Sequence, residues 1–307
     1  MSAKLPPDFG LMAPQVKGLI AAENLPVDFV AVVERWYLPI AARIAQAQTQ
    51  QAGTLLVSIS GAQGSGKSTL TAFLKLLLKA AWQLNTADIS LDDFYLTHAE
   101  RQQLALTEHP LLATRGVPGT HDLALATAVF DQLRQCSASQ PCQVPRFDKS
   151  VDDRRPAADW MLVDQRVDVI LFEGWCNNAP VATADSLREP INRLEAQEDP
   201  NGSWRHYVNA CLGRYHQALF SQTDLLVYIA IPSFDKVYEW RQLQEQKLAE
   251  KAAANTGVMD SVQLSRFIQH YERITRRCLE ELPQTADMVL NLNAEHGVDG
   301  LLLKPQG

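Results

Sequence analysis

The sequence predicts an α/β fold in which a mainly parallel central sheet carries helices on both faces. Short apolar runs rich in β-branched residues recur along the chain, and segments with apolar residues at three- and four-residue spacing separate them. Strands that alternate with helices form parallel sheets covered on both sides. Several of the apolar runs end in glycine or acidic residues, and ligands of such sheets bind at the carboxyl ends of the strands.

The composition is that of an ordinary globular protein. The chain has 307 residues, of which 46% are hydrophobic and 21% charged, and this excludes a disordered, collagen-like or low-complexity protein. Lys and Arg number 28 against 35 Asp and Glu, and the net charge of -7 argues against a nonspecific nucleic-acid partner. A small anionic ligand remains compatible, because it needs only local positive charge.

The cysteines and the N-terminal residues predict a reduced, cytoplasmic protein. The 5 cysteines are odd in number and no two have CxxC spacing, so neither a disulfide framework nor a zinc site is indicated. No apolar run approaches the roughly 18 residues of a membrane helix. The first residues combine prolines with an acid where a signal peptide needs an apolar core. We therefore expect no membrane partner, and the oligomeric state is not predicted.

The chain is predicted to form one domain over residues 53–307, preceded by a helical extension over residues 1–52. Within that extension, amphipathic helices are expected after Asp28. The expected strands cover residues 55–60, 87–95, 167–175, 223–231 and 286–293. The expected helices after the extension cover residues 69–84, 123–136, 207–220, 234–251 and 262–282. Residues 177–203 are polar and irregular, and they predict a surface insertion.

Residues 61–68, GAQGSGKS, match the phosphate-binding pattern GxxxxGK(S/T), with a predicted strand before them and a predicted helix after them. The glycines let the backbone N–H groups point at phosphate oxygens, and the helix N-terminus adds a favourable dipole. Lys67 is expected to contact the β- and γ-phosphates and to act in catalysis, and the Ser68 hydroxyl is expected to bind Mg²⁺. The expected nucleotide contacts are Gly61, Ala62, Gln63, Gly64, Ser65, Gly66, Lys67, Ser68 and Thr69.

This context predicts a P-loop NTPase, a three-layer sandwich with the sheet between two layers of helices, that binds ATP and Mg²⁺. A guanine-binding protein would also carry the string NKxD, which the sequence lacks, so ATP is the preferred nucleotide. The phosphate loop does not name a reaction, because ATPases, motors and small-molecule kinases share it. The residues at the other strand ends must distinguish these classes.

Acidic residues end two further predicted strands. Asp92 and Asp93 lie in the last part of the second predicted strand, where a carboxylate can accept a proton from an attacking hydroxyl, and a helix cap is the alternative. Glu173 follows an apolar run, at the position of a Walker-B carboxylate that holds Mg²⁺. Its alternative is a solvated acid at a strand end.

Two loops, residues 115–122 and 146–155, concentrate charged residues. They suit a pocket for a small anionic, polyhydroxy substrate, because an arginine can hold a carboxylate through two hydrogen bonds. A solvated surface loop is the alternative. The candidate substrate contacts are Arg115, His121, Arg146, Asp148, Lys149 and Arg154.

Arg241 lies in the predicted helix over residues 234–251, from which it could close over the phosphates and neutralise the charge that develops in transfer. It is therefore a catalytic candidate, and an ordinary surface arginine is the alternative. Trp240 beside it is expected to pack. Asn291, Asn293 and His296 follow the last predicted strand and are weak candidates for nucleobase contacts.

The strings GAQGSGKST, SLDDFY and FEGW together resemble the P-loop kinases of the phosphoribulokinase, uridine kinase and pantothenate kinase superfamily. The strings RGVPGTHD, PRFDKS, DDR and VYEWRQLQEQ look more narrowly like D-glycerate 3-kinases of the plant type and their bacterial relatives, and this resemblance covers residues 53–295. It implies phosphorylation of a hydroxyl of D-glycerate by ATP, with Mg²⁺, to give 3-phosphoglycerate and ADP. It also implies that Asp92 is the base.

The sequence departs from the plant pattern in one loop. Only Val151 and Asp152 separate DKS from DR, and the plant enzymes have a longer, glycine-containing loop there. Kinases for another small alcohol, such as pantothenate or a nucleoside, therefore stay open as alternatives. A nucleotide-binding regulator without phosphotransfer is a further alternative, against which the strand-end acids argue, because binding alone does not require a general base.

Overall fold

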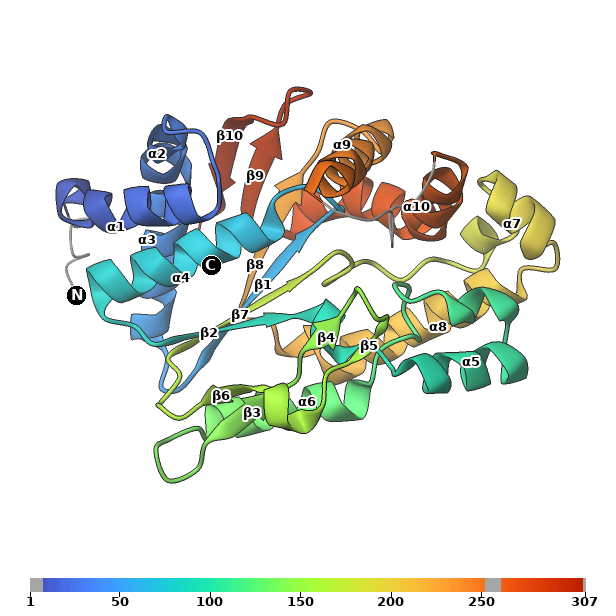
Figure 1. Cartoon of the computed structure of the whole chain (residues 1–307), viewed down its shortest axis with the longest axis horizontal. Helices are drawn as coiled ribbons and strands as arrows, with labels where there is room; N and C mark the ends of the chain where they lie inside the picture. Colours follow the sequence, from blue (N-terminus) through green and yellow to red (C-terminus); the bar gives the residue numbers. More distant parts are fainter. Residues whose placement is uncertain (1–7, 252–260, 306–307) are drawn as a thin grey trace.

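The central element of the fold is a six-stranded sheet with the strand order β10-β9-β8-β1-β7-β2 (Figure 1). The computed structural model describes residues 8–251 and 261–305, and for residues 244–251 it describes the backbone alone. β10 runs antiparallel to β9, and the other neighbouring strands pair in parallel. The strands are β1 (Leu55–Gly61), β2 (Thr86–Ser90), β7 (Val169–Gly174), β8 (Leu225–Ala230), β9 (Met288–Leu292) and β10 (Val298–Leu303). The predicted mainly parallel sheet is confirmed.

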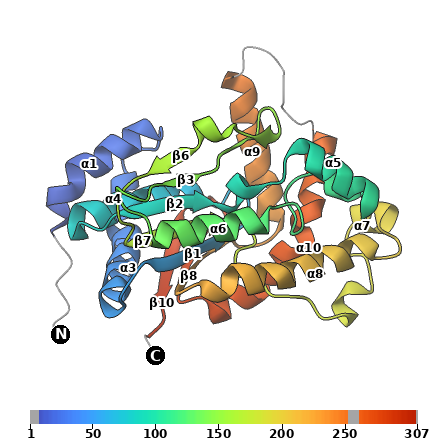
Figure 2. The same ribbon diagram turned by 90° about the horizontal axis from the view of Figure 1, so that it is seen from below.

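Helices cover both faces of this sheet, as predicted. One face carries α1 (Phe9–Ala22), α2 (Phe29–Val32), α3 (Leu38–Gln50) and α4 (Lys67–Trp82). Figure 2, seen from below, shows α6 (Leu123–Arg134) and α8 (Ser203–Ala218) lying across the opposite face. Further helices are α5 (His98–Thr107), α7 (Arg193–Glu198), α9 (Asp235–Lys251) and α10 (Ser261–Thr285). Two small antiparallel pairs join β3 (Cys142–Val144) to β6 (Met161–Val163) and β4 (Phe147–Asp148) to β5 (Asp153–Arg154).

β1 lies in the middle of the sheet and is buried along its whole length. Val57 and Ile59 pack in the same apolar cluster as α4, whereas Leu56 packs in the cluster of the opposite face. Successive side chains of a strand point to opposite faces, so a strand covered on both sides needs apolar residues at successive positions. This explains the short continuous apolar run from which the strand was predicted.

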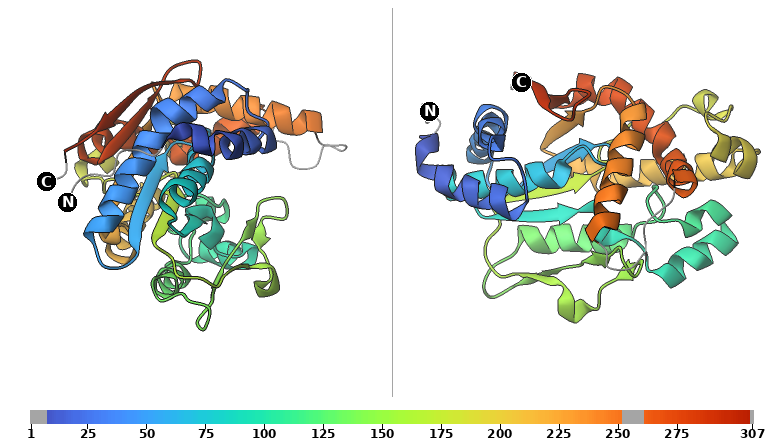
Figure 3. Two further views of the ribbon diagram at one scale, coloured as in Figure 1. Left: turned by 90° about the vertical axis from the view of Figure 1, so that its left-hand side faces the viewer. Right: turned by 45° about the horizontal axis from the view of Figure 1, so that its top comes forward.

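The N-terminal helices share the core of the sheet. Met12, Val16 and Ile20 of α1 are buried in the same apolar cluster as α4. Figure 3 shows the blue N-terminal helices beside the cyan α4, and a π-helical turn at Val33–Tyr37 joins α2 to α3. The division of the chain at residue 52 stays a prediction, and the helices before it contribute directly to the core.

Two strand predictions differ from the structure. β2 ends at Ser90, and Leu91–Phe94 form a 3₁₀ turn whose Asp92 N–H donates to the Ser90 hydroxyl at 3.3 Å. The predicted strand over residues 87–95 is therefore wrong beyond Ser90. β10 (Val298–Leu303) was not predicted, because its sequence alternates too weakly between apolar and polar residues. Its antiparallel pairing with β9 identifies it as a strand.

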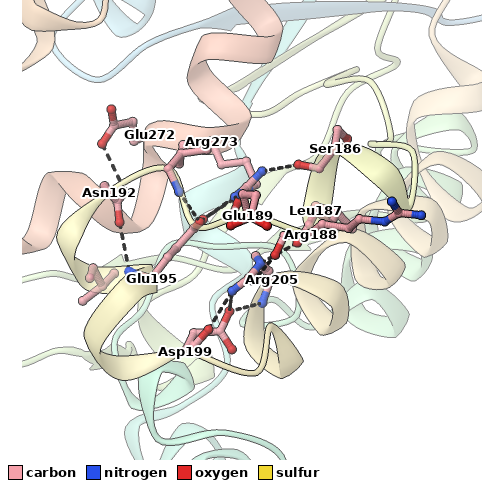
Figure 4. A network of polar contacts seen from close by, with 12 residues as sticks. Ser186, Leu187, Arg188, Glu189, Asn192, Glu195, Asp199, Arg205, Glu272 and Arg273 are labelled. Carbon is pink, nitrogen blue, oxygen red and sulfur yellow. Dashed lines mark hydrogen bonds and ion pairs between the residues drawn. The ribbon is translucent and has the colours of Figure 1, made fainter.

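The predicted irregular insertion at residues 177–203 is instead fastened to α8 and α10 (Figure 4). Arg273 of α10 donates to Glu195 of α7 from Nε at 2.8 Å and from Nη2 at 2.6 Å. Arg205 of α8 is buried and pairs with the buried Asp199 at 2.9 Å. Most residues of the segment are exposed, as the polar composition predicted, but Glu195 and Asp199 are buried and paired with Arg273 and Arg205. These pairs hold the segment against α8 and α10.

Candidate active site

The predicted phosphate loop is the turn that connects β1 to α4 at the carboxyl end of the central strand. A Cβ atom at Gly61 would lie 2.8 Å from the Ser65 hydroxyl, so the close approach requires glycine there. Gly66 has φ +87°, the left-handed conformation that glycine adopts readily, and α4 begins with the next residue. Residues 61–69, the predicted nucleotide contacts, thus form one continuous turn and the first residues of a helix.

Lys67 bends back over this loop. Its ammonium donates a hydrogen bond to the Ala62 carbonyl at 3.0 Å. Burial lowers the pKa of Lys67 below its ordinary value, while the Glu173 and Asp92 carboxylates act in the opposite direction. Both acids therefore lie close enough to Lys67 to interact with its charge, as expected from their positions at neighbouring strand ends.

Ser68 and Glu173 lie in contact beside the loop. The Ser68 hydroxyl donates to Glu173 Oε1 at 2.9 Å, and the other carboxylate oxygen, Oε2, is buried with no hydrogen-bond partner in the described part of the chain. Glu173 pairs with Ile59 in the parallel register between β7 and β1. A hydroxyl and a carboxylate oxygen fit Mg²⁺, which usually takes one or two protein oxygens and completes its shell with phosphate and water. Among the described residues, no group of three or more His, Cys, Asp or Glu side chains forms a metal site.

Asp92 faces the same edge of the sheet from the 3₁₀ turn. Its Oδ2 lies 2.6 Å from the Lys149 ammonium, and its Oδ1 accepts a hydrogen bond from the Tyr95 hydroxyl at 2.8 Å. Burial alone would raise the pKa of Asp92, but the charge and hydrogen bond of Lys149, the Tyr95 hydroxyl and His121 together lower it. Asp92 is therefore an ionised carboxylate held between a cation and a phenol.

Asp93 points to a different partner. It pairs with Arg146 Nη1 at 2.6 Å and accepts from the Phe147 N–H at 3.3 Å. Burial raises the pKa of Asp93, against the opposing effect of the Arg146 guanidinium. The two acids are not equivalent, and the cause is the 3₁₀ turn rather than strand alternation, because neighbouring residues of such a turn diverge by about 120°.

Arg146, Lys149 and Arg154 belong to the hairpin formed by β4 and β5, which we call the basic hairpin (residues 146–155). The hairpin lies against the turn that carries Asp92 (Figure 1). The Lys149 side chain is 60% exposed, whereas Arg154 is largely buried and donates to the Tyr95 carbonyl at 2.9 Å. The structure thus brings the predicted basic residues to the predicted base.

Asp148 has a local role in the hairpin. Its Oδ1 accepts hydrogen bonds from the Ser150 hydroxyl at 2.5 Å and from the Ser150 N–H at 2.9 Å, and both lower the pKa of Asp148. Its Oδ2 lies 3.4 Å from Arg155. The carboxylate therefore closes the hairpin turn, and this geometry gives no support to the predicted contact of Asp148 with a substrate.

Arg115 meets a second arginine that the sequence analysis did not identify. Arg101 of α5 is fully buried and donates from Nη2 to both Oδ2 and the backbone carbonyl of Asp152, each at 2.8 Å. Arg115 Nη1 pairs with the same carboxylate, and Asp152 has φ +55°. α5 is polar along most of its sequence, HAERQQLALT, so no apolar periodicity marks Arg101 as inward-facing.

His121 lies behind Tyr95. The two rings stack with centroids 4.4 Å apart, and His121 Nδ1 lies 2.8 Å from the Tyr215 hydroxyl, which also accepts from the Gly119 N–H at 2.8 Å. Burial lowers the pKa of His121 to about 3, although the nearby Asp92 carboxylate opposes this, and the ring is neutral at physiological pH. His121 therefore supports Tyr95 from inside the protein, and the predicted direct contact with a substrate finds no support in this placement.

Arg241 is half-buried on α9, and its charge acts on Tyr271 of α10. The Tyr271 hydroxyl donates to the Arg115 carbonyl at 3.1 Å. Trp240 is buried, as predicted, and packs on His296 with ring centroids 4.2 Å apart. Arg241 thus acts electrostatically on Tyr271, which is itself bonded to the loop of Arg115.

Comparisons with known proteins converge on kinases. No protein-family model matches the chain. An uncharacterized kinase of Schizosaccharomyces pombe is 34% identical over 224 residues, which are 70% of this chain and 78% of that protein. The chloroplastic D-glycerate 3-kinase of Arabidopsis thaliana is 32% identical over 71% of this chain but only 46% of its own length.

A solved structure agrees with these relatives. D-glycerate 3-kinase from Cryptococcus neoformans matches with a TM-score of 0.74 at 27% identity, over 87% of this chain and 99% of that one. No helix within the described ranges has the length and apolar character of a membrane span. A cytoplasmic location stays a prediction, since the Arabidopsis relative is named as chloroplastic.

Proposed function

The chain belongs to the family of P-loop kinases that includes D-glycerate 3-kinase, and from that premise we propose that it phosphorylates D-glycerate with ATP. The products would be 3-phosphoglycerate and ADP. The observation that carries the proposal is Asp92, which pairs with the Lys149 ammonium of the basic hairpin at 2.6 Å and also acts electrostatically on Lys67 of the phosphate loop. A general base between a phosphate site and a cluster of cations fits an acceptor that is itself an anion.

In the proposed reaction, Asp92 accepts the proton of the acceptor hydroxyl as its oxygen bonds to the γ-phosphorus. The bond between that phosphorus and the oxygen bridging to the β-phosphate breaks, and ADP leaves with the electron pair. Lys67 and the loop N–H groups hold the phosphates and offset the charge that moves onto ADP. Catalysis is mainly positioning and charge neutralisation, which is what a loose phosphoryl-transfer transition state requires.

We assign Mg²⁺ to Ser68 and Glu173. When bound there with ATP, the ion would neutralise charge on the β- and γ-phosphates. Glu173 Oε2 supports this assignment, because a buried carboxylate oxygen without a hydrogen-bond partner among the described residues has capacity for a cation. Arg241 is proposed to approach the phosphates from α9 and to stabilise the transferring group.

For the acceptor we assign different tasks to the predicted basic residues. Lys149 and Arg115 are proposed to bind the glycerate carboxylate, since their side chains retain exposed surface at 60% and 25%. Arg146 and Arg154 hold the basic hairpin through Asp93 and the Tyr95 carbonyl. Asp148 and His121 are proposed to support this arrangement without touching the acceptor.

The test is a panel of acceptors offered to the purified protein with ATP and Mg²⁺. D-glycerate, L-glycerate, pantothenate and uridine are compared by ADP release, and the product is identified by ³¹P NMR. We expect D-glycerate to give by far the highest kcat/KM and 3-phosphoglycerate as product, with Lys67→Ala as the inactive control. ADP release with pantothenate or uridine but not with glycerate would replace the substrate assignment, and ADP release with none of them would refute it.

A further inference from the structure

We propose that Lys149 holds Asp92 inactive until the carboxylate of the acceptor draws the ammonium away, so that the acceptor's own negative charge switches on the base. The inference rests on the proposed function, because it takes Asp92 as the proton acceptor. It makes Lys149 a specificity-determining residue that couples recognition of a carboxylate to catalysis at a neighbouring hydroxyl.

Both oxygens of Asp92 are engaged in the structure. Oδ1 accepts from the Tyr95 hydroxyl at 2.8 Å, and Oδ2 lies 2.6 Å from Lys149 Nζ. An ammonium at that distance stabilises the ionised carboxylate relative to the protonated one. It therefore opposes catalysis, because the base becomes protonated when it takes the proton of the acceptor. We take Oδ2, the oxygen paired with Lys149, as the one that the acceptor hydroxyl approaches. A productive complex therefore requires one of the two partners to move.

Tyr95 is the fixed partner. It is 4% exposed, stacks on His121 and packs edge-on against Phe147 at 5.2 Å. His121 is itself held by the Tyr215 hydroxyl. Moving the phenol away from Asp92 would disturb this buried stack.

Lys149 is the movable partner. Its side chain is largely exposed, and a lysine has a flexible stem with a compact charge that can exchange partners. The hairpin beneath it is anchored, since Arg146 is paired with Asp93 and the buried Arg101 is paired with Asp152. Release of Asp92 thus needs only a rearrangement of the Lys149 side chain at the tip.

Two anions could draw the ammonium away, the acceptor carboxylate and the γ-phosphate of ATP. We assign the carboxylate, because Lys67, the loop N–H groups and the proposed Mg²⁺ already serve the phosphates. A glycerate whose hydroxyl approaches Asp92 also places its carboxylate only two or three bonds away, within reach of Lys149 and Arg115. If ATP alone released Lys149, acceptors with and without a carboxylate would have similar kcat values.

The experiment compares Lys149→Met with the wild type and with Lys75→Met. Lys75 pairs with Asp88 on the surface of α4 and β2, so its replacement removes a lysine–aspartate pair away from the site. Glycerol serves as an acceptor without a carboxylate, alone and with added sodium acetate, and sodium chloride controls for ionic strength. ADP release without any acceptor, with water as the nucleophile, is measured for each protein.

In the wild type and in Lys75→Met, acetate should raise the kcat for glycerol several-fold, because it supplies the missing anion. In Lys149→Met without acetate, we expect the rates with glycerol and with water to be roughly tenfold higher than in the wild type, which is the factor for a lost charged hydrogen bond. Added acetate should not change these rates. Unchanged or lower rates with both nucleophiles in Lys149→Met would overturn the inference and leave Lys149 as a simple binding group. Equal wild-type kcat values for glycerol and glycerate would overturn it in favour of release by ATP.

The proposed function fails separately from this inference. A wild-type protein that releases no ADP with D-glycerate refutes the function. Normal wild-type turnover of D-glycerate, combined with unchanged glycerol and water rates in Lys149→Met, refutes the inference alone.

Discussion

Replacing Asp92 and Asp93 separately by asparagine tests the assignment of the base. Asp92→Asn keeps the shape of the side chain and an oxygen that can accept from the Tyr95 hydroxyl, but it removes the proton acceptor. We expect kcat to fall by roughly 10² to 10⁴, the usual contribution of a general base. ATP affinity should stay near the wild-type value, because the phosphate loop is unchanged.

The same substitution should change stability little. The Asp92–Lys149 pair is partly exposed, at 28% and 60%, and such pairs contribute at most about 1 kcal/mol. A kcat loss of 10² to 10⁴ corresponds to about 3 to 5 kcal/mol of transition-state stabilisation. The catalytic effect therefore exceeds the stability effect several-fold, and the two can be separated by measurement.

Asp93→Asn is the matched control. Burial raises the pKa of Asp93, so its ionisation opposes folding at pH values above its ordinary pKa, and an uncharged amide removes that penalty. The single amide oxygen can replace one of the two acceptor oxygens that Arg146 and the Phe147 N–H use in the wild type. We expect kcat within about tenfold of the wild type, well below the loss of a general base.

Steady-state ADP release gives kcat and KM for each variant, and urea denaturation gives its stability. A larger kcat loss in Asp93→Asn than in Asp92→Asn would refute the assignment of the base. Equal, mild losses in both would mean that positioning alone carries the transfer.

Three further substitutions or titrations follow from the site. Glu173→Gln should raise the Mg²⁺ concentration needed for half-maximal rate more than it raises the KM for ATP, and an unchanged Mg²⁺ titration would remove Glu173 from the metal site. Arg101→Met should lower the free energy of unfolding, measured in urea, by about 2 kcal/mol, because the buried charge-assisted hydrogen bonds to Asp152 are lost while Arg115 still pairs with that carboxylate. A change below about 0.5 kcal/mol would contradict the role of Arg101 in anchoring the basic hairpin. His121 should stay neutral down to a pH of about 3 in an NMR titration of the folded protein. Because the ring binds a proton near its ordinary pKa in the unfolded chain, His121 should lower the free energy of unfolding as the pH falls below about 6.5. Titration of the folded ring near pH 6 would contradict its burial.

The phosphate loop and the central sheet could be predicted because their signals are local. The strand β1, the loop and the start of α4 are consecutive in the chain, and each part has a recognisable composition. Glu173 could be placed beside the loop because parallel strands bring their carboxyl ends to one edge. The kinase resemblance rested on short strings at the same strand ends, and the relatives confirm it.

The pairing of charges around the base could not be predicted in the same way. Asp92 and Lys149 are separated by 57 positions, and no periodicity indicates that a hairpin tip meets this turn. Arg101 lies on a polar helix, and arginine is rarely fully buried, so composition favours exposure. The 3₁₀ turn was not predicted, because Leu91 continues the alternation of Ala87 and Ile89 and the aromatic Phe94 also suits a strand, whereas the capping interaction of Ser90 is a weak local signal.

The distribution of lysine and arginine is compatible with the proposed binding of ATP and an anionic acceptor by a chain with a net charge of -7. Arginines with buried or largely buried side chains, Arg101 and Arg154 among them, are tied to carboxylates and carbonyls of the protein and hold the hairpin in place. The exposed Lys149 has its carboxylate partner at the reacting edge, where an incoming anion can replace it. Arginine has a rigid fork that suits fixed, multiple hydrogen bonds, whereas lysine has a flexible stem that suits exchange. In the proposed mechanism, the positive charge of Lys149 therefore becomes available to an acceptor through the exchange of one carboxylate partner for another.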